Sequence, residues 1–556
     1  MFDTAPNSFS HKAYYITYQV TTLGEKIVGK TESQKLGLWQ NIILGLAFME
    51  PALSLLATFS LVLVAGYSWA AAPLAYLIAG FASIITAVSF AELVRAYPKG
   101  GSIWTFGTSS VGPKFGQFSV WVYLLEILVV PAATLIPVGF FALDWLGIPP
   151  WITVLTCVLL ILGFTIRGTK LSFRTAAVLL AAELAILFVF AGSSILWAIN
   201  LGTFADMATT AVTPAGSLLG LAGIMMGATV AIFSYIGFES PANMVEETRS
   251  PTRNIPRAII ISAVVGTVIT TFLAWAFVLA IPSKGLFSLL YYINPVPDMA
   301  GVIWGSQWRG IIDLVGMIGG FTAALAGVTA GSRLLQKLGE DKVIPTPFQR
   351  INAKYATPMF AILFIGLISL ILGQFTPWEV MAYTIAAGAI PTFIITNFLA
   401  FWKYIKSGYE LKNIVLHGLL PWIGIALCSW FAVVGLQIHI KMLLALWIAL
   451  GIFFVFVNVC FRPRVFSRED TEAGAERRAG KASWLGLALS IALLIMVILG
   501  FNYWYTFFSG GIQWWYIVAP YASGDLVAIT ITAACAIVLL AMMSYSLIRK
   551  KGEELK

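Results

Sequence analysis

Apolar stretches of about 20 residues repeat along the chain from Leu36 to Ile548, and short polar segments separate them. A helix of about 20 apolar residues is long enough to cross the hydrocarbon core of a bilayer. The pattern predicts fourteen membrane-spanning helices, at residues 37–65, 71–95, 117–143, 151–167, 175–200, 218–245, 258–281, 310–335, 357–374, 379–402, 417–437, 441–461, 484–507 and 523–547. We therefore expect an all-α polytopic membrane protein.

Two of these spans, the first and the sixth, are interrupted near their middle. Span 1 carries Glu50-Pro51, and span 6 carries SYIGFESP at residues 234–241. Proline lacks the N–H that a helix needs, and glycine tolerates dihedral angles that other residues avoid. Because the two interrupted spans are five positions apart in the order of spans, an odd number, the two helices should run in opposite directions. Paired broken helices in two halves of a chain are typical of inverted-repeat transporters with a site at the bilayer midplane. A pair of proline kinks healed by neighbouring helices is the simpler alternative.

Composition supports a membrane protein and gives its orientation. Of the 556 residues, 59% are hydrophobic and 11% are charged, whereas soluble chains carry about 25% charged residues. The net charge of +9 could indicate a nucleic-acid partner, but 31 of the 34 Lys and Arg residues fall in the tails and loops of one side. The other side keeps Lys284, Arg309 and Lys441. The positive-inside rule then places both termini in the cytoplasm, and no nucleic-acid partner is expected.

Four glutamates lie at membrane depth, namely Glu50, Glu126, Glu183 and Glu239. No Lys, Arg or His occupies the inner part of the first ten spans to pair with them. Ionisable residues inside a membrane mark functional sites by default. A carboxyl group buried without a counter-charge tends to be neutral and can exchange protons near neutral pH, so these four residues are candidates for proton coupling. The alternative for each is a protonated, hydrogen-bonded structural residue.

Signals of other protein classes are absent from the sequence. It contains no HExxH, GxSxG or P-loop motif, and its three histidines lie far apart. Its four cysteines are isolated in apolar runs, which predicts neither disulfides nor a metal site. We expect no enzyme activity, no cofactor and no metal. A channel would need a filter or a charged ring, which is not visible, and a membrane sensor without flux is the alternative from a different class.

Three ordered segments carry a resemblance to a known family. FAELVRAYPKGGSIWTF (90–106) follows span 2, FSYIGFESPANMVEETRSPTRNIPRAI (233–259) covers span 6 and its exit, and SRLLQKLGEDKVIPTPFQRINAKYATP (332–358) follows span 8. In these segments the chain resembles the amino acid–polyamine–organocation permease superfamily, over about residues 37–405. The resemblance implies a leucine-transporter-like fold with two inverted five-helix repeats, here followed by four extra C-terminal helices.

The span and charge pattern gives the parts of the chain, and the resemblance adds the residues of the site. The parts are a cytoplasmic N-tail (1–36), a transporter core (37–405), accessory spans 11 and 12 (406–461), a charged cytoplasmic linker (462–483), and accessory spans 13 and 14 with the C-tail (484–556). The expected substrate contacts are Glu50, Pro51, Ala52 and Ser54 in span 1; Ser234, Tyr235, Ile236, Gly237 and Phe238 in span 6; and Thr322 in span 8. Phe238 would sit at the aromatic gate position, and Glu183 lies near the place where proton-coupled relatives carry a lysine.

Span 1 departs from the family pattern. Amino-acid carriers of the family have Gly-Ser/Thr-Gly there, and the freed N–H groups bind the substrate carboxylate; here the stretch is Met49-Glu50-Pro51. An ionised Glu50 would repel a carboxylate by ~4 kcal/mol at ~4 Å and an effective dielectric of ~20, which is about three decades in affinity. The same charge would attract an ammonium group, and polyamine carriers of the family resemble this chain in placing a glutamate in the break.

We therefore expect a secondary active transporter of amino acids or related amines in the plasma membrane, working by alternating access and coupled to protons. A polyamine or cationic amine carrier that uses Glu50 is the alternative within transport. The sequence is compatible with sodium coupling, because hydroxyl and carbonyl ligands leave no distinctive pattern. It leaves open the substrate, the choice between symport, exchange and uniport, the oligomeric state and the role of the last two spans.

Overall fold

A computed structural model of the chain describes residues 35–65, 68–281, 295–405 and 414–461. These residues form helices and no β-strand, apart from two isolated bridges. The main helices are α2 (Leu38–Met49), α3 (Pro51–Ser60), α4 (Ala72–Ala96), α5 (Ile103–Ser110), α6 (Pro113–Leu146), α7 (Pro150–Arg167), α8 (Thr169–Asn200), α9 (Phe204–Thr210), α10 (Leu221–Ala231), α11 (Pro251–Ala280), α12 (Pro295–Trp304), α13 (Arg309–Glu340), α14 (Met359–Phe375), α15 (Trp378–Ile405), α17 (Leu420–Trp430) and α18 (Ile438–Phe461).

Ten helical segments in the described ranges are long and apolar enough to cross a membrane, and two shorter apolar helices accompany them. Each coincides with one of the first twelve spans expected from the sequence. The two remaining expected spans, 484–507 and 523–547, and the charged linker at 462–483 lie outside the described residues. The chain is therefore an all-helical, multi-pass membrane protein over the part that the structure describes.

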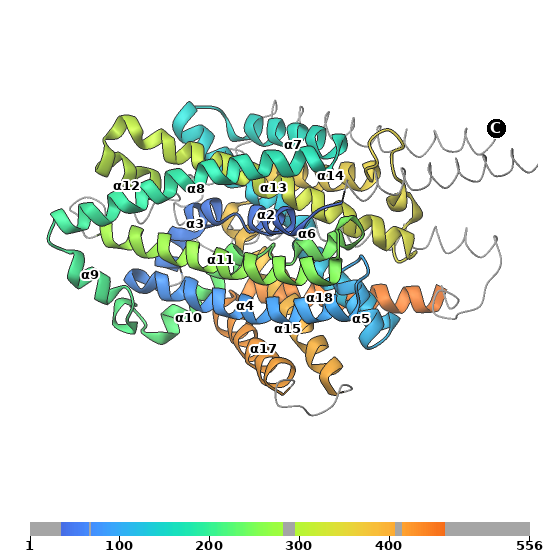
Figure 1. Ribbon diagram of the computed structural model, residues 1–556. Helices are drawn as coiled ribbons and strands as arrows, with labels where there is room; N and C mark the ends of the chain where they lie inside the picture. The colour runs from blue at the N-terminus through green and yellow to red at the C-terminus, as the bar shows by residue number, and fades with distance from the viewer. Residues whose placement is uncertain (1–34, 66–67, 282–294, 406–413, 462–556) are drawn as a thin grey trace, which may run out of the picture.

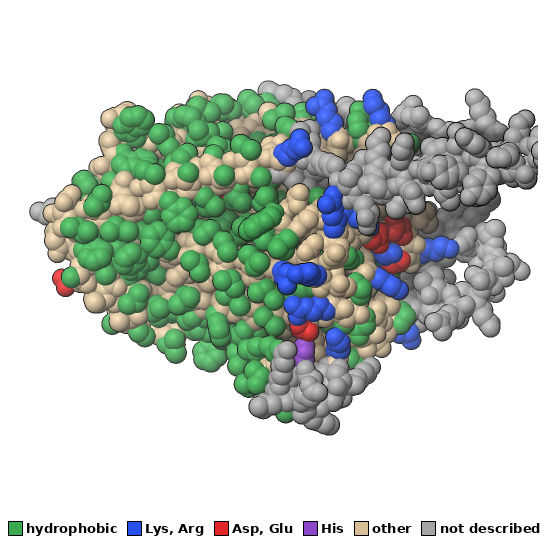
Figure 2. All heavy atoms as spheres, in the orientation of Figure 1, with side chains coloured by type: hydrophobic (Ala, Val, Ile, Leu, Met, Phe, Trp, Pro, Cys, Tyr) green, Lys and Arg blue, Asp and Glu red, His purple; other side chains and the backbone are tan. Residues whose placement is uncertain are grey.

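The surface agrees with this assignment. Hydrophobic side chains cover a broad region of the face shown in Figure 2, whereas Lys and Arg side chains gather toward one end. Exposed apolar side chains such as Val178, Val189 and Phe456 have more than 60% of their area free, as expected where lipid tails would contact the protein. We call the end that carries the Lys and Arg residues the cationic end.

The first span is broken at the predicted position. Helix α2 ends at Met49, Glu50 takes a left-handed conformation with φ 46° and ψ 74°, and α3 begins at Pro51. The residue before a proline avoids the right-handed helical region, and proline itself fits the first position of a helix. Glu50 still donates its backbone N–H to Leu46 O at 2.8 Å. The chain therefore ends one helix and starts another at a single buried residue.

The sixth span is broken over a longer stretch. Helix α10 continues into the 3₁₀ helix η4 (Ile232–Tyr235), Ile236 is extended, and Gly237 has a φ of 115°. A second 3₁₀ segment, η5 (Ser240–Glu247), completes the span. The left-handed φ at Gly237 is a conformation that side-chain-bearing residues rarely adopt, which explains why a glycine stands there.

The two breaks touch each other at the centre of the helical bundle. A methyl group placed on Gly237 would lie 2.7 Å from Met49 N and from the carbonyl carbon of Phe48. At the cationic end, Leu36 donates its N–H to Glu247 O at 2.7 Å. Contacts at both levels show that α2 and η5 run in opposite directions. Figure 1 shows α2 and α3 in the middle of the molecule, and α2 packs against α8, α11 and α13.

Helices α6 and α13 form a close-packed support beside the breaks. Methyl groups on Gly316 and Gly320 of α13 would overlap with the side chains of Phe141 and Val138 of α6. Small residues let membrane helices approach closely. Helix α6 stays continuous through Pro131 and Pro137, so this helix is long and unbroken where spans 1 and 6 are not.

Candidate functional site

A small cavity lies where the two broken spans meet α6, α13 and α15. Its volume is about 10 Å³, roughly the space of one water molecule. It is lined by Phe48, Met49, Glu50, Ser54, Val130, Thr134, Phe233, Ile236, Ala323 and Ile385. The site is therefore closed in this structure, and an organic substrate would require the surrounding helices to move apart.

Glu50 contributes a buried carboxyl group to this site. Its residue is 1% exposed, and neither side-chain oxygen has a hydrogen-bond partner among the described residues. A methyl group on Gly319 would lie 2.8 Å from Glu50 Oε1 and 3.2 Å from Glu183 Oε2, so the two carboxyl groups are neighbours. The backbone N–H groups of Ala52 and Leu53, in the first turn of α3, act on this carboxyl group. The side chain of Glu50 thus lies at the N-terminus of α3, where a helix attracts negative charge.

Glu239 and Glu126 form a second carboxyl pair. Glu239 follows the break in span 6, and its carboxylate accepts the Gly237 N–H at 3.0 Å and the Tyr123 hydroxyl at 3.4 Å. Glu126 of α6 is its electrostatic neighbour, and the backbone of Glu126 packs on Gly388 of α15. Each pair therefore joins a broken span to an unbroken helix. Glu50 of span 1 pairs with Glu183 of α8, and Glu239 of span 6 pairs with Glu126 of α6.

No described Lys, Arg or His side chain acts on either carboxyl pair. The sequence predicted four glutamates at membrane depth without a basic partner, and the structure brings them together in two pairs. Two neighbouring carboxylates in a medium of low dielectric need positive charge. A proton or a substrate ammonium group can supply that charge.

The expected contacts of span 1 all lie at the break and are buried. Pro51 and Ala52 form the first turn of α3. Ser54 lines the cavity, and its hydroxyl donates to Met49 O at 2.6 Å, across the break. This hydrogen bond satisfies one of the carbonyl groups that the interruption leaves without a helical partner.

The expected contacts of span 6 separate into two groups. Ile236 lines the cavity, and the hydroxyl of Ser234 is buried without a partner among the described residues. Tyr235 points elsewhere, because its hydroxyl donates to Tyr76 O of α4 at 2.6 Å. Phe238 packs between the rings of Phe90 and Phe393, at centroid distances of 5.9 and 5.4 Å.

Gly237 and Thr322 complete the expected set. Gly237 packs against the backbone of span 1 and leaves no room for a side chain. The hydroxyl of Thr322 is buried without a partner in the described part of the chain, and the next residue, Ala323, lines the cavity. In this closed conformation Tyr235 and Phe238 do not line the cavity, and their role as substrate contacts stays a prediction.

Sequence reasoning missed the apolar half of the cavity. Phe48 and Phe233 each lie within a few residues of a break, and Phe233 packs edge-on against Trp378 at a centroid distance of 5.4 Å. Val130, Thr134 and Ile385 come from α6 and α15. The position of Phe48 and Phe233 beside the breaks was a usable signal, but nothing local in α6 or α15 marks the other three residues.

A second, larger cavity of about 730 Å³ lies at the cationic end. Charged side chains line it, among them Lys35, Arg167, Glu246 and Lys337. Asn243 of η5 also lines it and donates to the Tyr123 hydroxyl at 3.5 Å. Because Tyr123 in turn contacts Glu239, a chain of polar groups joins this cavity to the second carboxyl pair.

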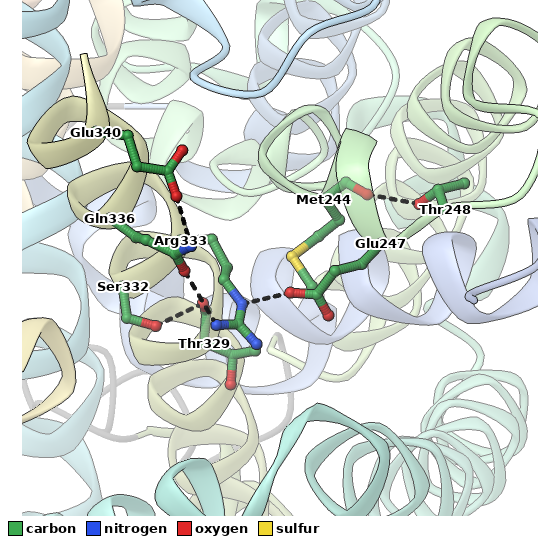
Figure 3. A network of polar contacts seen from close by, with 8 residues as sticks. All are labelled: Met244, Glu247, Thr248, Thr329, Ser332, Arg333, Gln336 and Glu340. Carbon is green, nitrogen blue, oxygen red and sulfur yellow. Dashed lines mark hydrogen bonds and ion pairs between the residues drawn. The ribbon is translucent and has the colours of Figure 1, made fainter. Parts of the chain in front are cut away.

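An ion pair links the broken span 6 to α13 beside this cavity (Figure 3). Arg333 Nε lies 2.5 Å from Glu247 Oε1, and the Arg333 side chain is 10% exposed. Arg333 also donates to Gln336 Oε1 at 3.3 Å, and Gln336 donates to Glu340 Oε1 at 2.9 Å. The network therefore ties the end of η5 to α13.

A family model described as amino acid permease matches residues 36–474, which include both breaks and both carboxyl pairs. The chain belongs to the amino acid permease family. Such a permease is a membrane transporter and not an enzyme, in agreement with the expectation from the sequence.

Several curated permeases are similar to this one over most of its length. The low-affinity putrescine importer PlaP of Escherichia coli (strain K12) is 29% identical over 77% of this chain and 94% of its own length. The branched-chain amino acid permease BcaP of Lactococcus lactis is 26% identical over 68% of this chain and 84% of its own. The methylthioribose transporter of Bacillus subtilis is 23% identical over 68% and 83%.

Proposed function

We propose that this permease is a proton-coupled secondary transporter of amino acids or related amines, and that a small cationic amine is the substrate class that its site fits best. The observation that carries the proposal is the position of Glu50. Its carboxyl group lies at the start of α3, beside the carboxyl group of Glu183, and no described cation neutralises either one.

A substrate carboxylate is poorly accommodated at this position. Pro51 offers no N–H, and the charge of Glu50 would oppose a second negative group by ~4 kcal/mol at ~4 Å and an effective dielectric of ~20. An ammonium group gains from the same geometry. The apolar wall formed by Phe48, Phe233 and Val130 would contact the methylene groups of an amine. The similarity to a putrescine importer agrees with this substrate class.

The alternative substrate class is an intact amino acid. The similarity to a branched-chain amino acid permease favours it, and so does the apolar lining of the cavity. In that case Glu50 would be protonated during binding, and its role would be coupling rather than selection. The two classes are distinguished by whether a diamine or a neutral amino acid competes for the site.

Proton coupling is proposed from the two carboxyl pairs. A pair that binds one positive charge can exchange a proton for an ammonium group. The polar chain from the cationic cavity through Asn243 and Tyr123 to Glu239 gives the second pair a route to one side of the membrane. After proton release through this route, the Glu239–Glu126 pair would take up a new proton when the site opens to the other side.

We further propose alternating access on a leucine-transporter-like architecture with two inverted five-helix repeats. The touching, oppositely directed broken spans support this arrangement. Spans 1 and 6 would move against the support formed by α6 and α13, and the Arg333–Glu247 pair would break when the site opens toward the cationic end. The expected location is the plasma membrane, with both termini in the cytoplasm.

The test uses the full-length permease in proteoliposomes with an imposed pH gradient. Labelled putrescine and labelled isoleucine are supplied separately, and uptake is measured with and without the gradient. We expect putrescine to accumulate only with the gradient. Accumulation of isoleucine that putrescine does not inhibit would support the amino-acid alternative. Binding of either compound without flux would indicate a sensor, and accumulation driven by a sodium gradient alone would refute proton coupling.

A further inference from the structure

A second group of charged side chains lies at the end of the molecule opposite to the cationic end. Arg309, at the start of α13, forms ion pairs with Asp144 at the end of α6 and, at 2.6 Å, with Asp298 of α12. Asp313 lies one turn further along α13, on the same face as Arg309. Three carboxyl groups therefore surround a single guanidinium group.

Within the described residues, Asp313 is the carboxyl group of this cluster that forms no ion pair. The residue is 1% exposed, and its Oδ1 is buried without a hydrogen-bond partner among the described residues. Its electrostatic neighbours are Asp144, Arg309 and Asp298, so Asp313 belongs to the same charged cluster. A buried carboxyl oxygen without a partner is costly, and the guanidinium group of Arg309 is already shared by two other carboxylates.

The cluster lies on the same helix as the central site. Gly319, against which the carboxyl groups of Glu50 and Glu183 rest, is six residues after Asp313, or about 9 Å along α13. Helix α12, which carries Asp298, packs on α3, the half of span 1 that begins at the break. The cluster therefore lies within about two helical turns of the central site.

The chemistry of the cluster fits an ammonium group. The indole of Trp145 packs directly against Gly310 in the first turn of α13, and an indole beside carboxylates is a favourable environment for an organic cation. A divalent metal fits less well, because the described residues contain no group of three or more His, Cys, Asp or Glu side chains placed to hold one.

We propose that Asp313, together with Asp144 and Asp298, forms a first binding site for the ammonium group of an incoming amine. This inference rests on the proposed function, because it requires a cationic substrate. The site collects the substrate at the end opposite to the cationic end, before the Glu50–Glu183 pair binds it at the centre.

The test compares Asp313→Asn with wild type in proteoliposomes of the full-length permease. We expect the KM for putrescine to rise about fivefold, or ~1 kcal/mol at 1.4 kcal/mol per tenfold change, with kcat unchanged. The KM for isoleucine, or for another neutral substrate, should not move. Asp206→Asn is the matched control, because Asp206 is an exposed acid of α9 outside the cluster. Asp144→Asn, at a side chain that is 34% exposed, should change KM in the same direction and tests the site if Asp313→Asn fails to fold.

Four outcomes would overturn the inference. An unchanged putrescine KM in Asp313→Asn and Asp144→Asn, with wild-type transport of putrescine, removes the first site and leaves the proposed function intact. An equal change for putrescine and for a neutral substrate would show that the cluster only holds the fold or a gate. Competition by Mg²⁺ at constant ionic strength would show a metal site. Wild-type protein that carries no cationic amine at all would remove the proposed substrate class and this site with it.

Discussion

Replacing Glu50 by glutamine tests the central claim about the site, because the change removes one charge and keeps the shape of the side chain. Glu50 is 1% exposed, and its neighbours within the described residues are the carboxyl group of Glu183, Gly319 and the first N–H groups of α3. The amide can occupy the same space. A change in transport would therefore report on charge rather than on packing.

The magnitude follows from the electrostatics of a buried contact. A carboxylate and an ammonium group at ~4 Å attract each other by ~4 kcal/mol at an effective dielectric of ~20. Because Glu183 remains beside the substrate, we expect Glu50→Gln to weaken putrescine binding by about 100- to 1,000-fold rather than to abolish it, at 1.4 kcal/mol per tenfold change. Binding of a neutral amino acid should improve or stay constant, because a repulsive charge is lost.

The assay measures inhibition of labelled substrate uptake in proteoliposomes, with putrescine and isoleucine as competitors. Gradient-driven accumulation of putrescine is measured in the same vesicles. Asp206→Asn serves as the control for the loss of one exposed carboxylate. If Glu50→Gln keeps the wild-type affinity for putrescine and the wild-type response to the pH gradient, Glu50 neither selects the substrate nor carries the proton, and the reasoning from the break in span 1 is wrong.

Three further changes test the surrounding structure. Gly237→Ala should lower the melting temperature in detergent or prevent folding, because its φ of 115° and the backbone of span 1 at 2.7 Å leave no place for a methyl group. Gly192→Ala, in open space on α8, is the control and should be neutral. Equal stability of the two variants would contradict the contact. Glu239→Gln should reduce accumulation driven by the pH gradient while substrate exchange at equal pH continues; full accumulation would exclude Glu239 from coupling. Arg333→Glu should block transport, because it places a second carboxylate next to Glu247 where an opposite charge stood. Adding Glu247→Arg should restore transport. No recovery in the double variant would show that the ion pair is not the essential contact.

Membrane architecture could be predicted from the sequence because its determinants are local. Apolar length sets each span, and the first twelve expected spans coincide with helices in the described residues. The interruption at Glu50-Pro51 was also predictable. A proline disfavours the helical conformation of the residue before it, and this effect involves only neighbouring atoms. Proline alone does not decide a break, however. Helix α6 runs through Pro131 and Pro137 without interruption. This helix packs along α13 over much of its length.

The residues of the site were predictable one at a time but not as neighbours. The glutamates at membrane depth stood out because a charge there is costly. That Glu50 faces Glu183 and that Glu239 faces Glu126 follows from contacts between helices more than a hundred residues apart in sequence. The direction of Tyr235 and Phe238, away from the cavity and toward α4 and α15, follows from the same contacts.

By itself, the sequence determined the class of the protein, the first twelve spans and the two places where a span breaks. These depend on hydrophobicity and on backbone chemistry, which act over a few residues. Only the tertiary structure decided that the breaks touch each other, that four acids form two pairs, and that Asp313 joins Asp144, Asp298 and Arg309 at one end. These arrangements depend on how closely the helices pack. A glycine such as Gly319 allows close packing, but the sequence around it does not say which helices pack there.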